Sequence, residues 1–469
     1  MRTGKLDRNP AISVADRAGS KENRQMINRW NVFKALGILI VAVSVPHGAD
    51  STPQQWTPDD PGSDNIEVVA HLPLGPRLSV ADIEIEQELD RPFVYIARMV
   101  YGSVGEKGTD IISIEDPANP RVIYRWRIEN QDLHQGTGGM DVKYFKWNDR
   151  YYLVQSVQFN QGGPNSAMGA VILDVTGLPD PATVREVARI QAPDQPTGFH
   201  NIFIYTHANG RVLLFATTEG SAVNVYDLGD VVEDRQGEAL VATVPVPVGS
   251  GMNPMASYHD MYVAYHVDSQ QDRFYGAGTG GYYVYNVTDI ANPELLVALI
   301  DIEGVKDGHT FSATPDGRYV VAETEYRYAP LRIFDLQPAL DGEVTTIQVP
   351  ISVWTADWHH LVHNQEIRWP YVFVSGYMDG LQVFSLMDPH NPATVAYYDT
   401  YVGPLNTDVY PTDNGAFGVD VRNADGLIVI SDMTTGFWAF RMDGFRGWNG
   451  ADWGLPDISS AQQWPDGER

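Results

Sequence analysis

Four histidines occupy equivalent positions in four consecutive repeats of the chain, and their type and spacing suit metal chemistry. Each begins an apolar segment, and the four are His200, His259, His309 and His359. Iron, copper and zinc accept neutral imidazole as a ligand, whereas calcium and magnesium prefer oxygen. If the fold brings these segments together, the sequence predicts a divalent transition metal (iron, copper or zinc) held by the four imidazoles.

The alignment of the fourth histidine leaves an alternative. Three of the four share the pattern aromatic–His–polar–apolar, which covers residues 199–202, 258–261 and 358–361. In the last of these, His360 follows His359 directly. A shift of one residue in the alignment makes His360 the ligand instead.

Three acidic residues near the histidines are candidates to orient them. Glu323 and Glu325 end a strand, and Asp260 follows His259. A carboxylate that accepts a hydrogen bond from the second ring nitrogen fixes a metal-binding histidine in place. The competing interpretation is structural: repeats copy residues along with folds, and such a histidine can bond to the backbone of a neighbouring repeat. The other three repeats carry Ala81, Met140 and Phe417 at this position, an asymmetry that favours a site.

Composition excludes several other kinds of function. The chain has 469 residues, no cysteine and a formal net charge of -28. Thiolate sites and disulfides are therefore ruled out, and binding to nucleic acid is not expected. The glycine-rich pieces at 136–139 and 278–281 do not open helices, so no nucleotide cofactor is predicted.

The histidines belong to a repeat of four short strands that returns seven times. An alternating strand joins a turn of Asp, Asn, Gly and Pro and then another apolar strand, most clearly at 111–123, 171–184, 283–296 and 381–395. The first strands of the repeats open at residues 81, 140, 200, 259, 309, 359 and 417. Four-stranded repeats of 50 to 60 residues are typical of propeller blades. The prediction is an all-β, seven-bladed propeller over residues 66–444, with strand 66–72 completing the last blade and closing the ring.

The remaining segments flank this domain. Residues 1–49 contain an apolar stretch, Ala35–Val45, behind basic residues, which predicts a signal peptide and a periplasmic or secreted protein. An uncleaved anchor is the alternative, and no stable membrane span is expected in the mature chain. Residues 50–65 are interpreted as a linker and 445–469 as a C-terminal tail.

The turn phrases carry a resemblance to a known family. Residues Glu115–Pro120, Thr288–Pro293 and Asp388–Pro392 resemble the turns of LVIVD-repeat proteins, and the resemblance extends over residues 66–444. It implies an exported bacterial propeller and little chemistry. Two functions stay open: a metal-dependent oxidoreductase that acts on a small molecule, or a non-catalytic extracytoplasmic scaffold that binds protein or glycan.

Overall fold

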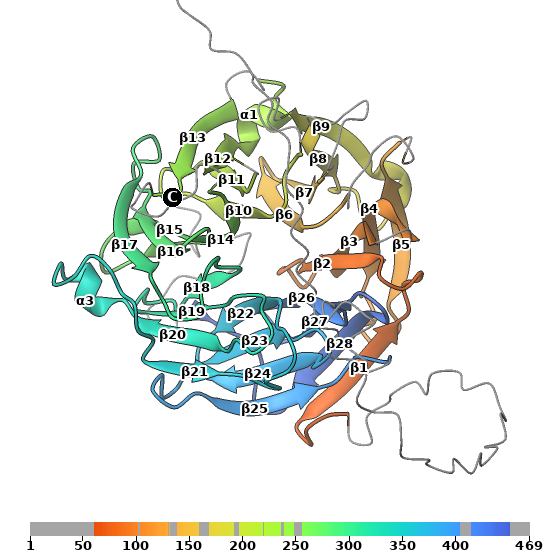
Figure 1. Cartoon of the computed structure of the whole chain (residues 1–469). Coiled ribbons are helices and arrows are strands. Elements are labelled where there is room, and N and C mark those ends of the chain that lie inside the picture. The colour runs from red at the N-terminus through yellow and green to blue at the C-terminus, as the bar shows by residue number, and fades with distance from the viewer. Residues whose placement is uncertain are drawn as a thin grey trace, which may run out of the picture. The chain divides into compact units, whose positions relative to one another are not determined.

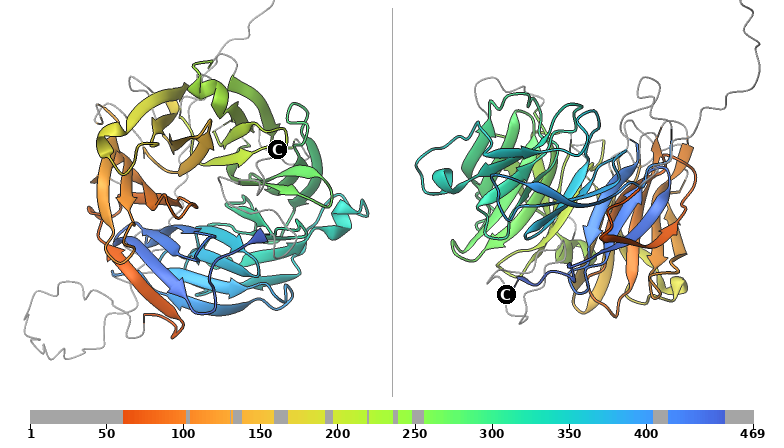
Figure 2. Two further views of the ribbon diagram at one scale, coloured as in Figure 1. Left: turned by 180° about the vertical axis from the view of Figure 1, so that it is seen from behind. Right: turned by 90° about the horizontal axis from the view of Figure 1, so that it is seen from below.

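Seven four-stranded antiparallel sheets are arranged in a ring around a central channel (Figure 1). The computed structural model describes residues 61–450 except 102–103, 130, 132–137, 159–167, 192–196, 219, 236–238, 248–255 and 404–413. The predicted all-β, seven-bladed propeller is therefore confirmed. Figure 2 shows the blades from behind and from below.

Each of the first six blades runs from the channel outward in chain order. Blade 1 has β2 (Val80–Ile85), β3 (Phe93–Tyr101), β4 (Val104–Ser113) and β5 (Arg121–Arg127); blade 2 has β6 (Val142–Trp147), β7 (Arg150–Ser156), β8 (Met168–Asp174) and β9 (Arg185–Gln191). Blade 3 has β10 (Ile202–Thr206), β11 (Val212–Ala216), β12 (Ala222–Asp227) and β13 (Leu240–Pro245); blade 4 has β14 (Tyr258–His266), β15 (Gln271–Gly278), β16 (Gly281–Asn286) and β17 (Glu294–Ile300). Blade 5 has β18 (Phe311–Ala313), β19 (Tyr319–Ala322), β20 (Leu331–Asp335) and β21 (Ser352–Trp354); blade 6 has β22 (Asn364–Arg368), β23 (Tyr371–Ser375), β24 (Leu381–Ser385) and β25 (Ala393–Tyr398). Short helices α1 (Leu228–Val232) and α3 (Gln337–Leu340) lie in outer connections.

Blade 7 is built from both ends of the propeller. It contains β26 (Ala416–Val421), β27 (Ile428–Asp432) and β28 (Gly436–Met442), and its outer strand is β1 (Ile66–Leu72). β1 pairs antiparallel with β28, from Ile66 opposite Met442 to Leu72 opposite Phe437. The predicted ring closure by the strand at 66–72 is confirmed, and the pairing covers the edge that β28 would otherwise expose.

The recurring turn phrase has a direct physical cause. In three blades an aspartate side chain accepts a hydrogen bond from the amide nitrogen two residues on and from the asparagine side chain three residues on; these pairs are Asp116 with Asn119, Asp289 with Asn292, and Asp388 with Asn391. Such side-chain bonds stabilise a tight turn. The turn connects the third strand of each blade to its outer strand.

The apolar core lies between blades, because both faces of each sheet are covered by a neighbouring sheet. Ile83 and Ile96 of blade 1, for example, belong to one buried cluster with Val429 and Ala439 of blade 7. Burial on both faces explains the nearly continuous apolar runs of the strands. Rigid blades of this kind hold the inner strands in fixed positions around the channel.

One predicted strand start is wrong. The inner strand of blade 6 is β22, which begins at Asn364, whereas the sequence pattern placed its start at His359. Residues 357–360 instead form a turn in which the amide of His360 donates to the Asp357 carbonyl. The segment Trp358–Leu361 has the same sequence pattern as the start of the other inner strands, but it precedes the strand itself.

Several sequence predictions fall wholly or partly outside the described residues. These are the signal peptide and extension at 1–49, most of the linker at 50–65, and the tail beyond residue 450. At the start of the tail, Trp448 is buried and its amide donates to the Asn423 carbonyl. Within the described ranges, no helix has the length and apolar character needed to cross a membrane.

Removal of β1 tests the closure. A chain that starts at residue 73 lacks the outer strand of blade 7 and loses its ladder with β28. We expect its free energy of unfolding to fall by on the order of 5 kcal/mol, since several hydrogen bonds of about 1 kcal/mol each and their packing are lost. The control is a chain that starts at residue 61, which should unfold as the longer protein does. Equal unfolding midpoints for the two chains in thermal denaturation would contradict this role of β1.

Candidate metal centre

The inner strands bring a layer of four histidines to one end of the channel. Three are the predicted His200, His259 and His309, and the fourth is His363, which immediately precedes β22. Their rings form a continuous series: the centroids are 4.5 Å apart between His200 and His259, 4.2 Å between His259 and His309, and 4.9 Å between His309 and His363. The His363 ring then contacts Phe417 of blade 7 at 3.7 Å.

His359 and His360 lie apart from this series. The side chain of His359 is 73% exposed, and its Nδ1 is 2.9 Å from Asp357. His360 Nδ1 is bonded to Asp379 Oδ1 at 2.6 Å. The structure therefore brings together three of the four predicted ligands, and His363 takes the place in blade 6 that the sequence pattern assigned to His359 or His360. The reason is the shifted start of β22.

Three of the four imidazoles are held by their Nδ1 atoms. Nδ1 of His200 is 3.0 Å from Gln158 Oε1, Nδ1 of His309 is 2.6 Å from Glu323 Oε2, and Nδ1 of His363 is 2.7 Å from the Phe417 carbonyl. All three partners are oxygen acceptors in these contacts, so each Nδ1 carries the proton. In the neutral form of each ring, the Nε2 atom then has a lone pair, which is the arrangement found in histidines that bind metals.

Two histidines and a carboxylate converge closely enough to share one ion. His259, His309 and Glu325 each offer a ligand atom, and these three atoms lie within 4.8 Å of one another. His309 Nε2 faces Glu325 Oε2 at 3.5 Å, and the other oxygen of Glu325 accepts a hydrogen bond from Tyr377. Among the described residues, neither His309 Nε2 nor His259 Nδ1 has a hydrogen-bond partner, although both atoms are buried. Buried polar atoms are seldom left without a hydrogen bond, so both nitrogens are candidates for ligand contacts; His309 Nε2 is the one that faces Glu325.

The electrostatics of the cluster favour neutral imidazoles around one positive centre. Burial lowers the pKa of His200 to about 4 and that of His363 to about 3, and nearby His309 lowers both further. Burial also lowers the pKa of His309, but attraction to Glu323 and Glu325 outweighs this and raises it to about 9. The two carboxylates thus stabilise positive charge at His309, whether a proton or a metal ion supplies it.

Glu323 distinguishes blade 5 from its neighbours. At the equivalent position beside the inner strand, blades 2, 3, 4, 6 and 7 carry small residues: Ser156, Thr217, Ala277, Ser375 and Ser431. Burial raises the pKa of Glu323 to about 7, so the carboxylate is an unfavourable choice unless it has a partner. Its partner is His309. Glu323, which the sequence nominated to orient a histidine, thus contacts one nitrogen of His309, and Glu325 faces the other.

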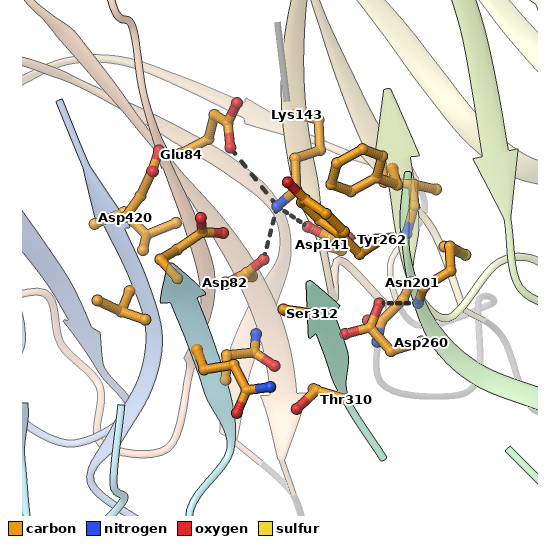
Figure 3. Close-up of a pocket in the computed structure, with 18 of the residues that line it drawn as sticks. Asp82, Glu84, Asp141, Lys143, Asn201, Asp260, Tyr262, Thr310, Ser312 and Asp420 are labelled. Atoms are coloured by element: carbon orange, nitrogen blue, oxygen red, sulfur yellow. Dashed lines mark hydrogen bonds and ion pairs between the residues drawn. The ribbon is translucent and has the colours of Figure 1, made fainter. Parts of the chain in front are cut away.

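Asp260 faces a different part of the channel. It lines a cavity of about 60 Å³ beyond the histidine layer, together with Asp82, Asp141 and Asp420 (Figure 3). Lys143 crosses this cavity, and its Nζ lies 2.8 Å from Asp141, 3.0 Å from Asp82 and 3.7 Å from Glu84. Burial raises the pKa of Asp141 and of Asp260 to about 7. The channel therefore has a histidine layer and, next to it, an acidic layer that is partly neutralised by Lys143 and by Arg368, whose guanidinium is 3.5 Å from Asp420.

The sequence pattern missed three participants. His363 could have been found, since His363-Asn364 repeats the His-polar pair of His200-Asn201 and His309-Thr310. Gln158 and Tyr377 follow the second strands of blades 2 and 6, and no local motif marks them. Their roles depend on where neighbouring blades end, which a single repeat does not reveal.

Replacement of Lys143 by methionine tests the balance of the acidic layer. We expect Lys143→Met to lower the free energy of unfolding by about 3 kcal/mol at pH 8, because buried carboxylates lose their counter-charge. The loss should be smaller at pH 5. A carboxyl with a raised folded pKa is stabilising while protonated and loses that contribution as the pH rises through about 7, the value for Asp141.

Urea denaturation at the two pH values measures both quantities. The matched control is Lys146→Met on the same strand, where the ammonium lies 5.5 Å from the Tyr151 ring and contacts no carboxylate in the described structure. The control should change stability little at either pH. An equal loss for Lys143→Met at pH 5 and pH 8 would contradict the assigned electrostatics.

Comparison with known proteins adds no assignment to this geometry. No family model matches the chain, and no curated protein matches its sequence. The resemblance to LVIVD-repeat proteins therefore stays a prediction from the turn phrases. The chemistry of the channel has to be inferred from its own side chains.

Proposed function

We propose that the propeller binds one divalent transition metal at the histidine end of its channel and acts as a metal-dependent oxidoreductase. His259, His309 and Glu325 are the ligands, with His200 and His363 beside them. The observation that carries the proposal is the convergence of these ligand atoms within 4.8 Å, with the His309 ring anchored at Nδ1 by Glu323. A purely structural histidine does not need an unpaired, buried ring nitrogen.

Iron(II) is the metal that this ligand set favours. Two histidines and one carboxylate with open positions are the ligand set of non-haem iron(II) oxygenases, whereas copper and zinc sites use other combinations more often. The distance between His200 Nε2 and His259 Nε2 is 3.0 Å. With its ring anchored by Gln158, His200 would be a further ligand beside His259.

The bound metal would supply electron transfer to dioxygen or to an organic substrate at its open positions. The surrounding residues supply orientation and charge. Glu323 holds the His309 ring, Gln158 holds the His200 ring, and Tyr377 donates to Glu325. These contacts fix the ligands before an ion arrives, which lowers the cost of binding it.

The compartment and the competing function follow from the sequence. The apolar segment near the N-terminus and the resemblance to LVIVD-repeat proteins support a periplasmic or secreted protein that acts on a small molecule. The alternative is an extracytoplasmic scaffold whose histidines only join blades. Metal content separates the two, because a scaffold of this kind binds no ion at the channel.

Metal analysis of variants tests the proposal. Protein purified without a His tag or chelator and loaded anaerobically with iron(II) should contain about one equivalent of metal. His259→Ala, His309→Ala and Glu325→Gln should each weaken binding at least tenfold, because each removes one ligand. His359→Ala is the control, since its exposed side chain lies outside the cluster. The absence of bound iron, copper or zinc in the unaltered protein, with all variants folded, would make the histidines structural.

Glu323→Thr tests the anchor of His309 separately. Threonine stands at the equivalent position of blade 3, so the fold should tolerate it, while the bond from His309 Nδ1 is lost. We expect metal affinity to fall by about 10- to 100-fold, as is usual when the partner of a ligating histidine is removed. Competition with a chelator measures the affinity, and thermal unfolding checks the fold. Unchanged affinity in a folded variant would remove Glu323 from the site.

A further inference from the structure

A second pocket adjoins the histidine layer on the side of blades 3 and 4. It has a volume of about 200 Å³ and is bounded in part by His200 and His259. Its other polar lining comes from Gln158, Thr197, Thr218 and Ser257. Two of the proposed metal-binding rings therefore form a wall shared by the cluster and this pocket.

The pocket differs from the neighbouring channel in charge. The described residues that line it include no Asp, Glu, Lys or Arg, whereas the channel cavity is lined by Asp82, Asp141 and Asp260. An anion would also be repelled by a protein with a net charge of -28. A cation would gain more by moving to the acidic layer than by staying here. The described part of the lining thus offers an ion no counter-charge, which favours a neutral occupant.

Two of the lining residues have a buried polar atom without a hydrogen-bond partner in the described structure. Within the described part of the chain, Thr197 Oγ1 and His259 Nδ1 have no hydrogen-bond partner. The Thr197 hydroxyl can donate and accept, and an imidazole nitrogen without a proton accepts. Because buried polar atoms are seldom left unpaired, a ligand that bonds to Thr197 gains more than one that is wholly apolar.

We propose that this pocket binds the substrate of the metal site, and that the substrate is a small, uncharged molecule with a hydroxyl, carbonyl or amide group. This inference rests on the proposed function. Sites for drug-sized ligands have volumes of about 300 to 1,000 Å³, so the occupant is smaller than these. Thr197 positions it beside His259, at the edge of the metal cluster.

Matched probes test the charge and the polar contact. The probes are propan-1-ol, propanoate and propylamine, together with benzyl alcohol, benzoate and benzylamine, which vary the charge on two skeletons. Each is titrated at pH 7 into the full chain, once after chelator treatment and once with zinc bound, and binding is followed by ligand-observed NMR. We expect at least one alcohol to bind tenfold or more tightly than its charged partners.

Variants assign the binding to the pocket. Thr197→Val should weaken alcohol binding about tenfold, while Thr197→Ser, which keeps the hydroxyl, should restore it. The control is Thr345→Val, at an exposed position beside β17 on the outer side of blade 5. Metal content should be the same in all three variants, and unfolding midpoints show that each is folded.

The outcomes separate this inference from the proposed function. A charged probe that binds as tightly as its alcohol, no alcohol binding up to 10 mM, or full alcohol binding in Thr197→Val would overturn the pocket assignment. Loss of the metal site with retained, Thr197-dependent alcohol binding would instead overturn the proposed oxidoreductase. In that case the pocket would not be the substrate site of a metal centre, although it would still be a site for neutral ligands.

Discussion

The pairing of β1 with β28 is the interaction on which the remaining structure depends. β1 pairs with β28 within the sheet of blade 7 and leads along the chain into blade 1, so this ladder ties the first blade to the last. Once the ring is closed, Ile85 of blade 1 donates its amide to Asp420 of blade 7 at 2.9 Å. The same kind of bond joins Ile202 of blade 3 to Asp141 of blade 2 at 2.8 Å. Channel aspartates thus connect neighbouring inner strands, which explains why several blades retain an acid there.

Closure also determines which parts of the site the sequence could reveal. His200, His259 and His309 stand at one position of a repeat, and a propeller places equivalent positions in one layer, so their proximity followed from repetition alone. His363 obeys the same rule, but Trp358-His359-His360-Leu361 offers a better local match four residues earlier. Local similarity could not decide between them. The decision comes from β22, whose pairing with β23 from Asn364 to Arg368 fixes the register.

Contacts between blades could not be predicted in this way. Gln158 reaches His200 from the preceding blade, and Tyr377 reaches Glu325 from the following one. Such contacts depend on the length and direction of the segments after the second strands, which vary from blade to blade. The acidic layer was visible in part, because Asp82, Asp141 and Asp260 follow the same repeat position. The sequence did not reveal that Lys143 partly neutralises this layer. Lys143 stands two residues after Asp141 in blade 2, whereas blade 1 has Glu84 two residues after Asp82.

The case for a functional site rests finally on residues that the fold does not need. Blades 2, 3, 6 and 7 place Ser156, Thr217, Ser375 and Ser431 beside the inner strand, and these hydroxyls bond to nearby backbone groups: Ser156 to the His200 carbonyl, Ser375 to the Phe417 carbonyl, for example. Blade 5 buries Glu323 there instead, at an electrostatic cost that its raised pKa reports. A propeller blade is complete without this carboxylate. Together with Glu325 it surrounds His309 with negative charge in a layer of otherwise neutral imidazoles, an arrangement that stabilises positive charge at this point. Function is expected where residues depart from the repeat pattern, reduce the stability of the fold and lie close together in space.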